Sequence, residues 1–115
     1  MKILITGVAG FLGSHLAQKF CDLGHHVIGV DNMIGGYKDN IPNNIKFFKF
    51  DCCDLKKMNN VMKNIDIVYH CAATAHEGLS VFSPYEITKN NFLASVAVFT
   101  AAVSKKVKRI KIIKK

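Results

Sequence analysis

Three glycines near the start of the chain have the spacing and the neighbours of a phosphate-binding turn. Gly7, Gly10 and Gly13 come directly after the apolar run Lys2–Thr6 and open a segment of helical periodicity. A glycine turn between a strand and a helix exposes backbone N–H groups to a pyrophosphate, and the helix N-terminus adds partial positive charge. The spacing is not the Gly-x-Gly-x-x-Gly of the standard dinucleotide fingerprint, so a purely structural glycine turn is the alternative interpretation.

A carboxylate follows at a position where it could select the nucleotide. Asp31 lies 18 residues after Gly13, at the end of the apolar run Val27–Val30. At the carboxyl end of a strand, such a side chain can accept hydrogen bonds from both ribose hydroxyls of adenosine and would repel a 2′-phosphate. Together with the glycines, Asp31 therefore favours NAD over NADP. Taken alone, Asp31 could simply open a loop with Asn32.

The elements that must position these groups follow from the hydrophobic pattern. Short apolar runs of strand length alternate with segments of helical spacing, and continuous apolar strands are typical of a parallel sheet covered on both faces. A serine followed by a proline predicts the start of the last helix. The predicted strands are 2–6, 27–30, 45–50, 65–70 and 109–113, and the predicted helices run from Gly13 to Gly24, over 55–64, and from Ser83 to about Ser104.

The composition limits the class of protein. The chain has 115 residues, half of them hydrophobic, which predicts one domain with a core. There is no apolar run of membrane-spanning length and no signal-peptide layout after Met1, so we expect a soluble, cytoplasmic protein. The four cysteines form no C-x-x-C pair and have no zinc-finger spacing with the histidines, which predicts reduced thiols and no metal site.

The net charge of +8 is concentrated at one end of the sequence. Residues 105–115 hold seven of the sixteen basic side chains and no acidic one, so residues 1–104 carry nine basic and eight acidic side chains. A run of lysines is most often a solvated surface. Nucleic-acid binding through this segment is a minor alternative, and it would weaken steeply with salt.

Several motifs together resemble a known family. Residues Thr6–Ser14 resemble the T-G-x-x-G-F-[IL]-G-S signature of extended short-chain dehydrogenases/reductases, and the chain looks like an NAD-dependent nucleotide-sugar epimerase/dehydratase similar to UDP-glucose 4-epimerase. The likeness runs from Lys2 to about Ile110. It implies an α/β Rossmann-type fold over residues 1–115, with a doubly wound parallel sheet of about five strands in the order 3-2-1-4-5 and NAD across the strand ends.

The resemblance also implies roles for individual residues. Asp31-Asn32 matches the adenosine-ribose pair, Gly35-Gly36 the adenine-side loop, and Asp51-Cys52 the adenine contact, while Val68–Ala73 is similar to the V-x-H-x-A-A run near the pyrophosphate and nicotinamide ribose. Asn91 matches a helix asparagine that faces inward near the nicotinamide. The implied cofactor-binding set is Gly7, Gly10, Phe11, Leu12, Gly13, Asp31, Asn32, Asp51, Cys52, Cys71, Ala72, Ala73 and Asn91.

The catalytic elements of that family do not occur at the matching positions. The family has a Ser/Thr after the fifth strand and a later Tyr-x-x-x-Lys, whereas Tyr85 and Lys89 match this spacing before the fifth strand, in the wrong place. The resemblance therefore implies the NAD-binding, N-terminal portion of a nucleotide-sugar epimerase or dehydratase, without its substrate domain and inactive alone. A homodimer is one assembly that it allows for the complete enzyme. The alternative is a non-catalytic dinucleotide-binding module.

Overall fold

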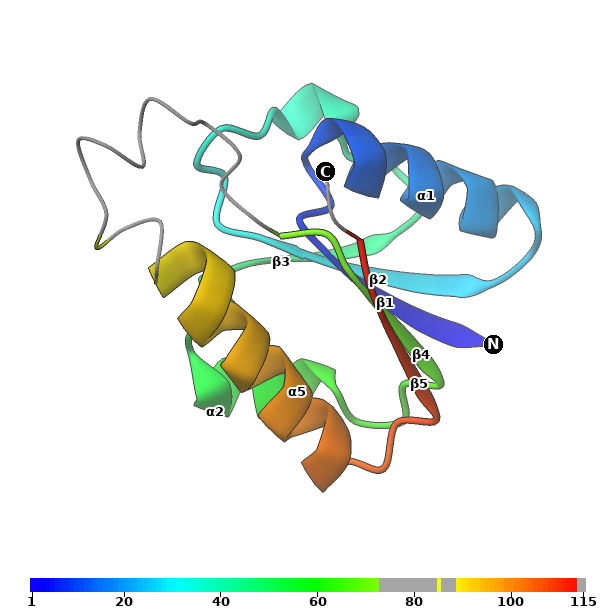
Figure 1. Ribbon diagram of the computed structural model, residues 1–115. Helices are drawn as coiled ribbons and strands as arrows, with labels where there is room; N and C mark the ends of the chain where they lie inside the picture. The colour runs from blue at the N-terminus through cyan, green and yellow to red at the C-terminus, as the bar shows by residue number, and fades with distance from the viewer. Residues whose placement is uncertain (73–84, 86–88, 114–115) are drawn as a thin grey trace.

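A five-stranded parallel sheet with helices on both faces forms the computed structural model (Figure 1), which describes residues 1–72, 85 and 89–113. The strand order is β3-β2-β1-β4-β5, the predicted doubly wound arrangement. The elements are β1 (Lys2–Thr6), α1 (Phe11–Asp22), β2 (His26–Asp31), β3 (Lys46–Lys49), α2 (Leu55–Val61), β4 (Ile67–His70), α5 (Ala94–Ser104) and β5 (Arg109–Ile112), with a 3-10 turn at Lys38–Asn40 and a π-helical segment at Lys89–Leu93.

The central strand is β1, which pairs with β2 on one side and with β4 on the other. Ile3 lies opposite Val27 in β2 and Ile67 in β4. Because both of its edges and both of its faces are covered, Ile3, Leu4 and Ile5 have no exposed surface. This is the environment that a continuous β-branched and aliphatic run predicts.

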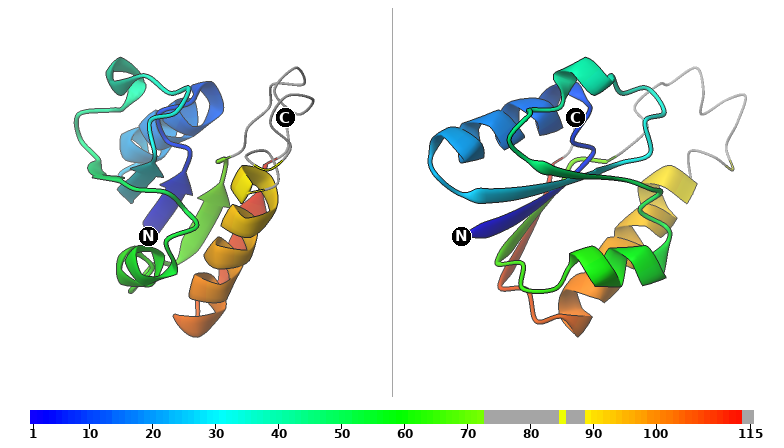
Figure 2. Two further views of the ribbon diagram at one scale, coloured as in Figure 1. Left: turned by 90° about the vertical axis from the view of Figure 1, so that its left-hand side faces the viewer. Right: turned by 180° about the vertical axis from the view of Figure 1, so that it is seen from behind.

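Two hydrophobic layers hold the helices against the sheet. On one face Leu4 and Val68 pack with Met58 of α2 and Val98 of α5, and on the other face the sheet packs against α1 through Ala17. Figures 1 and 2 show α1 on one side of the sheet and both α2 and α5 on the opposite side. The carboxyl ends of β1, β2 and β4 are consequently left open at one end of the sandwich, between the two helical layers.

The helix ends follow the chemistry of their terminal residues. Gly24 adopts φ +86° directly after α1, and its N–H donates to the carbonyl of Cys21, as expected for a glycine stop. Asp54 caps α2 by accepting a hydrogen bond of 3.2 Å from the N–H of Lys57. Helix α2 ends at Val61, three residues before the predicted end at Asn64, which has a left-handed φ of +63°.

The last helix differs from the expected one. Its predicted start at Ser83 lies outside the described residues, and the segment Lys89–Leu93 is π-helical before regular α-helix begins at Ala94. The aromatic residues of the helices, which helical spacing places in the core, are mostly at the surface. Phe11, Phe92 and Phe99 are 75, 63 and 37% exposed, and only the fourth helix phenylalanine, Phe20, packs against a core cluster.

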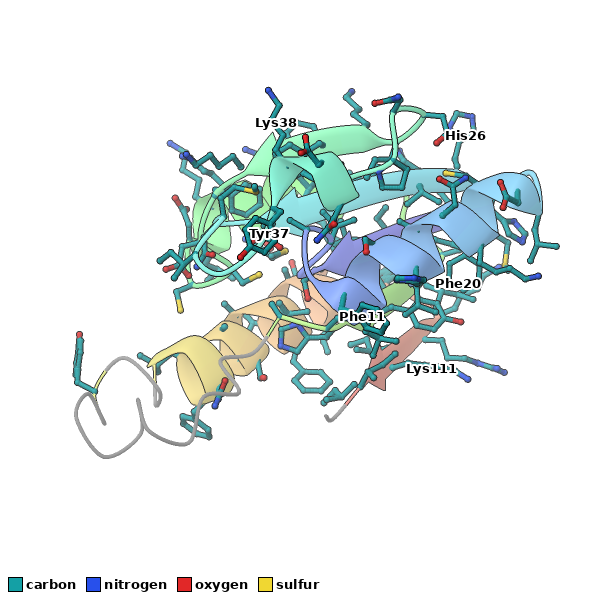
Figure 3. The ribbon with its side chains drawn as sticks, turned by 90° about the horizontal axis from the view of Figure 1, so that it is seen from above. Phe11, Phe20, His26, Tyr37, Lys38 and Lys111 are labelled. Carbon is teal, nitrogen blue, oxygen red and sulfur yellow. The ribbon has the colours of Figure 1, made fainter. Side chains whose placement is uncertain are left out.

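The basic end of the chain lies on the turn after α5 and on the edge strand β5. Lys105, Lys106, Lys108, Arg109 and Lys111 are exposed, which explains how a lysine is accommodated in this strand. Figure 3 shows Lys111 on the edge of the sheet opposite to the loop that carries Tyr37 and Lys38. Within the described ranges, no helix is long and apolar enough to cross a membrane.

Candidate functional site

The glycine turn after β1 is held by backbone hydrogen bonds and by close packing. Gly7 has φ +71° and donates its N–H to the carbonyl of Val30 at 2.8 Å, and Gly10 donates to the carbonyl of Gly7 at 3.1 Å. A Cβ on Gly7 would lie 2.8 Å from the backbone nitrogen of Ala72, and a Cβ on Gly13 would collide with the carbonyl oxygen of Gly7. The turn therefore depends on residues without side chains, since backbone meets backbone on both sides of it.

Asp31 connects the end of β2 to this turn. Its side chain is 8% exposed, and its two carboxylate oxygens accept hydrogen bonds from the N–H groups of Ala9 at 2.9 Å and Met33 at 2.7 Å. Each carboxylate oxygen has two lone pairs, so both atoms can accept further bonds from the side of the pocket. Asp31 is thus fixed in direction by main-chain donors while it retains capacity for a ligand hydroxyl.

The loop after β2 folds back over the turn. Ala9 accepts hydrogen bonds through its carbonyl oxygen from the N–H of Tyr37 at 3.2 Å and from the amide of Asn40 at 3.1 Å. A Cβ on Gly36 would lie 2.8 Å from the Cβ of Ala9, so the loop and the turn are in contact at this point. Asn32 begins the loop with its side-chain oxygen accepting from the N–H of Ile34.

A second carboxylate and a buried thiol lie after β3. The Oδ1 atom of Asp51 accepts a hydrogen bond of 2.9 Å from the N–H of Cys53. Cys52 is buried, and burial, followed by the nearby carboxylates of Asp51 and Asp31, raises the pKa of its thiol to about 12. Cys52 is therefore a neutral, unreactive wall residue at physiological pH.

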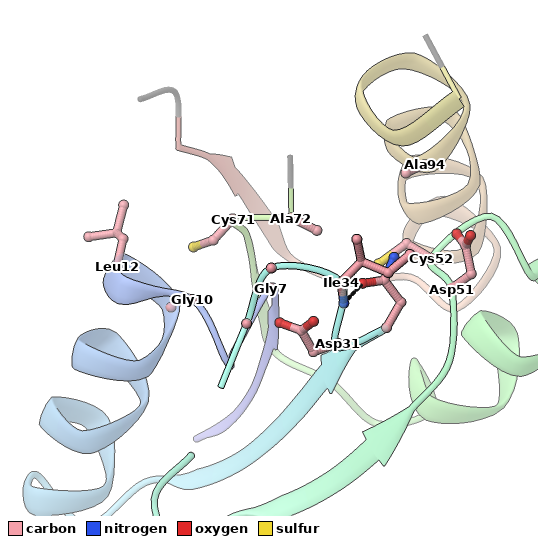
Figure 4. A pocket seen from close by; sticks show the side chains of 14 residues that line it. Gly7, Gly10, Leu12, Asp31, Ile34, Asp51, Cys52, Cys71, Ala72 and Ala94 are labelled. Carbon is pink, nitrogen blue, oxygen red and sulfur yellow. Dashed lines mark hydrogen bonds between the residues drawn. The ribbon is translucent and has the colours of Figure 1, made fainter. Parts of the chain in front are cut away.

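These segments surround one pocket at the carboxyl end of the sheet (Figure 4). Figure 4 shows the carboxylate of Asp31 beside Gly7, with Leu12 and Cys71 to one side and Asp51 to the other. Among the described residues, those that line the pocket include no Lys, Arg or His, so an anionic group there would be bound by main-chain N–H groups. The lining residues are Gly7, Gly10, Leu12, Gly13, Asp31, Asn32, Ile34, Gly35, Gly36, Asp51, Cys52, Cys71, Ala72 and Ala94.

Two of the described residues in the implied cofactor-binding set do not line this pocket. The side chain of Phe11 is 75% exposed and packs on the ring of His15, with the ring centroids 4.5 Å apart. Asn91 is exposed, so the expectation of a buried amide is wrong, and its contact with the nicotinamide half stays a prediction. Ala73 lies outside the described residues. The other ten residues of the set all contribute to the pocket.

The exposure of Asn91 is shared by the residues after it in the π-helical segment Lys89–Leu93. A seven-residue spacing puts Asn91 and Val98 on one face of a continuous α-helix, but a π-helix has more residues in each turn. Asn91, Phe92 and Leu93 are all exposed, so this end of the segment has no buried face, and burial begins at Ala94 in α5. Ala94, which is 3% exposed, lines the pocket instead.

Sequence reasoning left four lining residues out of the candidate set. Gly35 and Gly36 lie in the predicted adenine-side loop, and Ala94 lies one helical turn after Asn91, so each carries a signal that a wider set would use. Ile34 had none, because its place at the pocket depends on the contacts of the loop with Ala9.

Comparison with known proteins places the chain in a family. A profile of the NAD dependent epimerase/dehydratase family matches residues 3–113. The chain belongs to this family. It is 33% identical over 112 residues to a UDP-N-acetyl-alpha-D-glucosaminuronate decarboxylase of Bacillus cytotoxicus and 31% identical over 112 residues to a UDP-glucose 4-epimerase of Streptomyces lividans, covering 95% of this chain in both cases.

Solved structures of the family have the same fold over this length. A UDP-glucose 4-epimerase of Thermotoga maritima, solved with UDP-glucose, superposes with a TM-score of 0.94 at 32% identity over 97% of this chain. A UDP-glucose 4-epimerase of Thermus thermophilus, solved with NAD, gives 0.90 at 29% identity over 96%. The chain spans 37% and 36% of those two structures, and 35% and 34% of the two curated relatives above, so it corresponds to about a third of their length.

Proposed function

We propose that this chain binds NAD in the pocket at the carboxyl end of the sheet and forms the NAD-binding portion of a nucleotide-sugar epimerase, dehydratase or decarboxylase. The observation that carries the proposal is the placement of Asp31 against the glycine turn, fixed by the N–H groups of Ala9 and Met33. A buried carboxylate beside a phosphate-sized backbone cradle suits a ribose that is joined to a pyrophosphate.

The residues of the pocket fit a dinucleotide in a definite direction. The N–H groups from Gly7 to Gly10 already donate within the protein, so the pyrophosphate would be bound by those of Phe11 and Leu12 at the N-terminus of α1. A Cβ at Gly7 or Gly13 would collide with the backbone that shapes this turn. Asp31 accepts from the adenosine ribose, and Asp51 with Cys52 borders the adenine. Cys71 and Ala72 then lie toward the nicotinamide half.

The chemistry of the complete enzyme would come from the cofactor. NAD supplies reversible hydride transfer, and the protein binds and orients it. The names of the relatives describe enzymes of UDP-sugars, which supports a nucleotide-sugar substrate. We expect the 115 residues alone to bind NAD without turnover, because the Ser/Thr and Tyr-x-x-x-Lys elements do not occur at the family positions. Cytoplasmic location and a homodimer of the complete enzyme remain part of the proposal.

A non-catalytic dinucleotide-binding module is the second candidate. It is favoured by the pocket itself, whose walls come from four strand ends and two helices within this chain. Turnover of UDP-sugars by the protein at whatever length its own cells produce it distinguishes the two candidates. Turnover supports the enzyme, and NAD binding without turnover supports the module.

Isothermal titration of the 115-residue chain with NAD and with NADP tests the proposal. We expect saturable binding of NAD at one site and binding of NADP at least about tenfold weaker, because Asp31 repels a 2′-phosphate. Asp31→Ala should raise the Kd for NAD at least about tenfold, which corresponds to the loss of one charge-assisted hydrogen bond. Asp39→Ala is the matched control, since Asp39 is exposed on the 3-10 turn outside the pocket. Equal affinity of parent and Asp31→Ala overturns the proposal.

A further inference from the structure

His70 is a buried polar residue that the cofactor contacts do not explain. It ends β4, is 3% exposed, and does not itself line the pocket. Both ring nitrogens have partners on other elements. Its Nδ1 atom lies 2.6 Å from the hydroxyl of Thr6 at the end of β1, and its Nε2 atom lies 3.0 Å from the hydroxyl of Ser95 on α5.

The partners of those two hydroxyls determine where the imidazole carries its proton. The Thr6 hydroxyl accepts a hydrogen bond of 3.2 Å from the N–H of Ala72 through one lone pair, and its hydrogen can then donate to Nδ1. The Ser95 hydroxyl donates to the carbonyl of Asn91 at 2.8 Å, so its lone pair is left to accept from Nε2. The Ser95 end therefore specifies a tautomer with the hydrogen on Nε2, and the Thr6 end is compatible with it.

The surroundings of the ring also favour the neutral form. Of the described elements around it, β1 and α5 face it with the uncharged side chains of Thr6 and Ser95, and β5 places Ile112 opposite it in the register. Burial lowers the pKa of His70 to about 4. At neutral pH the imidazole is therefore a fixed dipole that accepts at one end and donates at the other.

This chain of hydrogen bonds joins three walls of the pocket. Thr6 directly precedes Gly7, and the backbone of Ala72 is so close to Gly7 that a Cβ there would lie 2.8–2.9 Å from it. On the other side, Ser95 directly follows Ala94, which lines the pocket from α5. The path from Ala72 through Thr6 and His70 to Ser95 thus crosses from the glycine turn and the end of β4 to the helix.

We propose that His70 is a positioning residue of the dinucleotide pocket, which acts through Thr6 and Ser95 to hold the glycine turn, the Ala72 wall and α5 at the spacing that the dinucleotide requires. This inference rests on the proposed NAD binding. It assigns His70 no contact with the cofactor and no proton transfer. His70 affects the free energy of NAD binding, because without this connection the walls of the pocket are less ordered and binding must include the cost of ordering them.

The chain contains a close control for Ser95. Thr100 lies on the same helix and donates its hydroxyl to the carbonyl of Val96, four residues earlier, at 2.7 Å. This bond repeats the one from Ser95 to Asn91, but Thr100 is exposed and Thr100 has no bond to His70 among those of the described residues. Thr100→Ala and Ser95→Ala therefore remove the same kind of helix hydroxyl, but only the Ser95 hydroxyl is bonded to the imidazole.

The test combines nitrogen-15 NMR of the imidazole with NAD titrations at a temperature where all variants are folded. We expect the Nε2–H tautomer in the parent at pH 7, and a Kd for NAD about tenfold higher in Ser95→Ala and His70→Phe. Ser95→Thr retains the hydroxyl and should remain within about twofold of the parent, as should Thr100→Ala. The NMR spectrum of Ser95→Ala should also lose the preference for Nε2–H, a change that a purely structural loss of stability would not produce.

The outcomes separate this inference from the proposed function. A parent that binds NAD while Ser95→Ala and His70→Phe bind it equally well overturns this inference alone. An Nδ1–H tautomer or an imidazolium at pH 7 overturns it as well. An absence of NAD binding by the parent overturns the proposed function and, with it, the positioning role.

Discussion

The Oδ2 atom of Asp31 accepts a hydrogen bond of 2.9 Å from the backbone N–H of Ala9, which ties the end of β2 to the middle of the glycine turn. The residue that selects the nucleotide in the proposed function therefore also contributes to the shape of the phosphate cradle. Specificity and stability are coupled at this position. A substitution of Asp31 changes both the ligand contacts and the geometry of the turn.

Asp31→Asn should lower the free energy of unfolding by about 1–3 kcal/mol, because one of two buried N–H donors then faces an amide NH2 instead of an acceptor. Urea denaturation of the chain without ligand measures this loss independently of NAD. Asp39→Asn, on the exposed 3-10 turn, should change the stability by less than about 0.5 kcal/mol. Equal stabilities for the two variants would show that the bonds from Asp31 to Ala9 and Met33 contribute nothing.

Gly13 in α1 and Gly24 just after it should differ strongly when replaced by alanine. Gly13→Ala brings a Cβ into the carbonyl of Gly7, a backbone atom that cannot move without opening the turn, so we expect a loss of about 3 kcal/mol or more. Gly24→Ala meets no atom within 4 Å and should cost only the strain of its φ of +86°, about 1–2 kcal/mol. Urea titrations of both variants give the order, and a smaller loss for Gly13→Ala would contradict the close packing of the turn.

The stability of the chain should depend on the protonation of His70. Its pKa is about 4 in the folded state and near 6.5 in the unfolded state, so between these values only the unfolded chain binds the proton. The contribution of neutral His70 to the free energy of unfolding is complete above about pH 6.5 and is lost as the pH falls to about 4. At 1.4 kcal/mol per pKa unit, this loss amounts to about 3 kcal/mol.

His70→Gln provides the comparison for this pH dependence, because glutamine does not titrate. Unfolding free energies of parent and His70→Gln are measured from pH 7 to pH 4. Over this range the parent should lose about 3 kcal/mol more than His70→Gln, because the groups that titrate in both chains cancel in the difference. If the unfolding free energies of the two chains ran parallel over this range, protonation of the buried His70 ring would carry no such free-energy cost.

Cys52 should be the slowest of the four cysteines to react with iodoacetamide. Its thiol is buried and has a pKa of about 12, so the reactive thiolate is rare at pH 8. Cys21 is half-buried on α1 and should be modified first by comparison. Peptide mapping by mass spectrometry after timed quenching measures both rates, and in 8 M urea, where the burial is removed, we expect the two rates to approach each other. Faster modification of Cys52 in the folded chain would contradict its burial.

The sequence predicted those parts of the fold that depend on local pattern. Apolar runs such as Val27–Val30 became buried strands, glycine spacing identified the turn at Gly7, and the resemblance to a family supplied the strand order. The prediction failed where a side chain is oriented by helix geometry rather than by its own type. Asn91 follows a regular seven-residue spacing, but it lies in a π-helical segment whose residues 91–93 are all exposed.

Contacts between distant segments were also beyond the sequence pattern. The residues around Ser95 give no indication of its hydrogen bond with His70, because this contact depends on the angle at which α5 crosses the sheet. Ile34 likewise reaches the pocket only because its loop is bonded to Ala9 at the turn. Such residues are found from coordinates, whereas Asp31 is found from its distance along the chain to a glycine turn.

The central position of β1 has a consequence for how the pocket comes into being during synthesis. Its first partner, β2, follows after about 20 residues, but its other partner, β4, begins at Ile67, and the wall at Cys71 and Ala72 comes still later. A nascent chain that has completed only the first βαβ unit therefore exposes one edge of β1. At that stage only half of the walls of the dinucleotide pocket are present. Contacts between segments so far apart in the sequence form slowly and cost chain entropy, so we expect NAD to bind only after β4 has paired with β1. NAD would then stabilise the finished fold by mass action and would not direct its early steps.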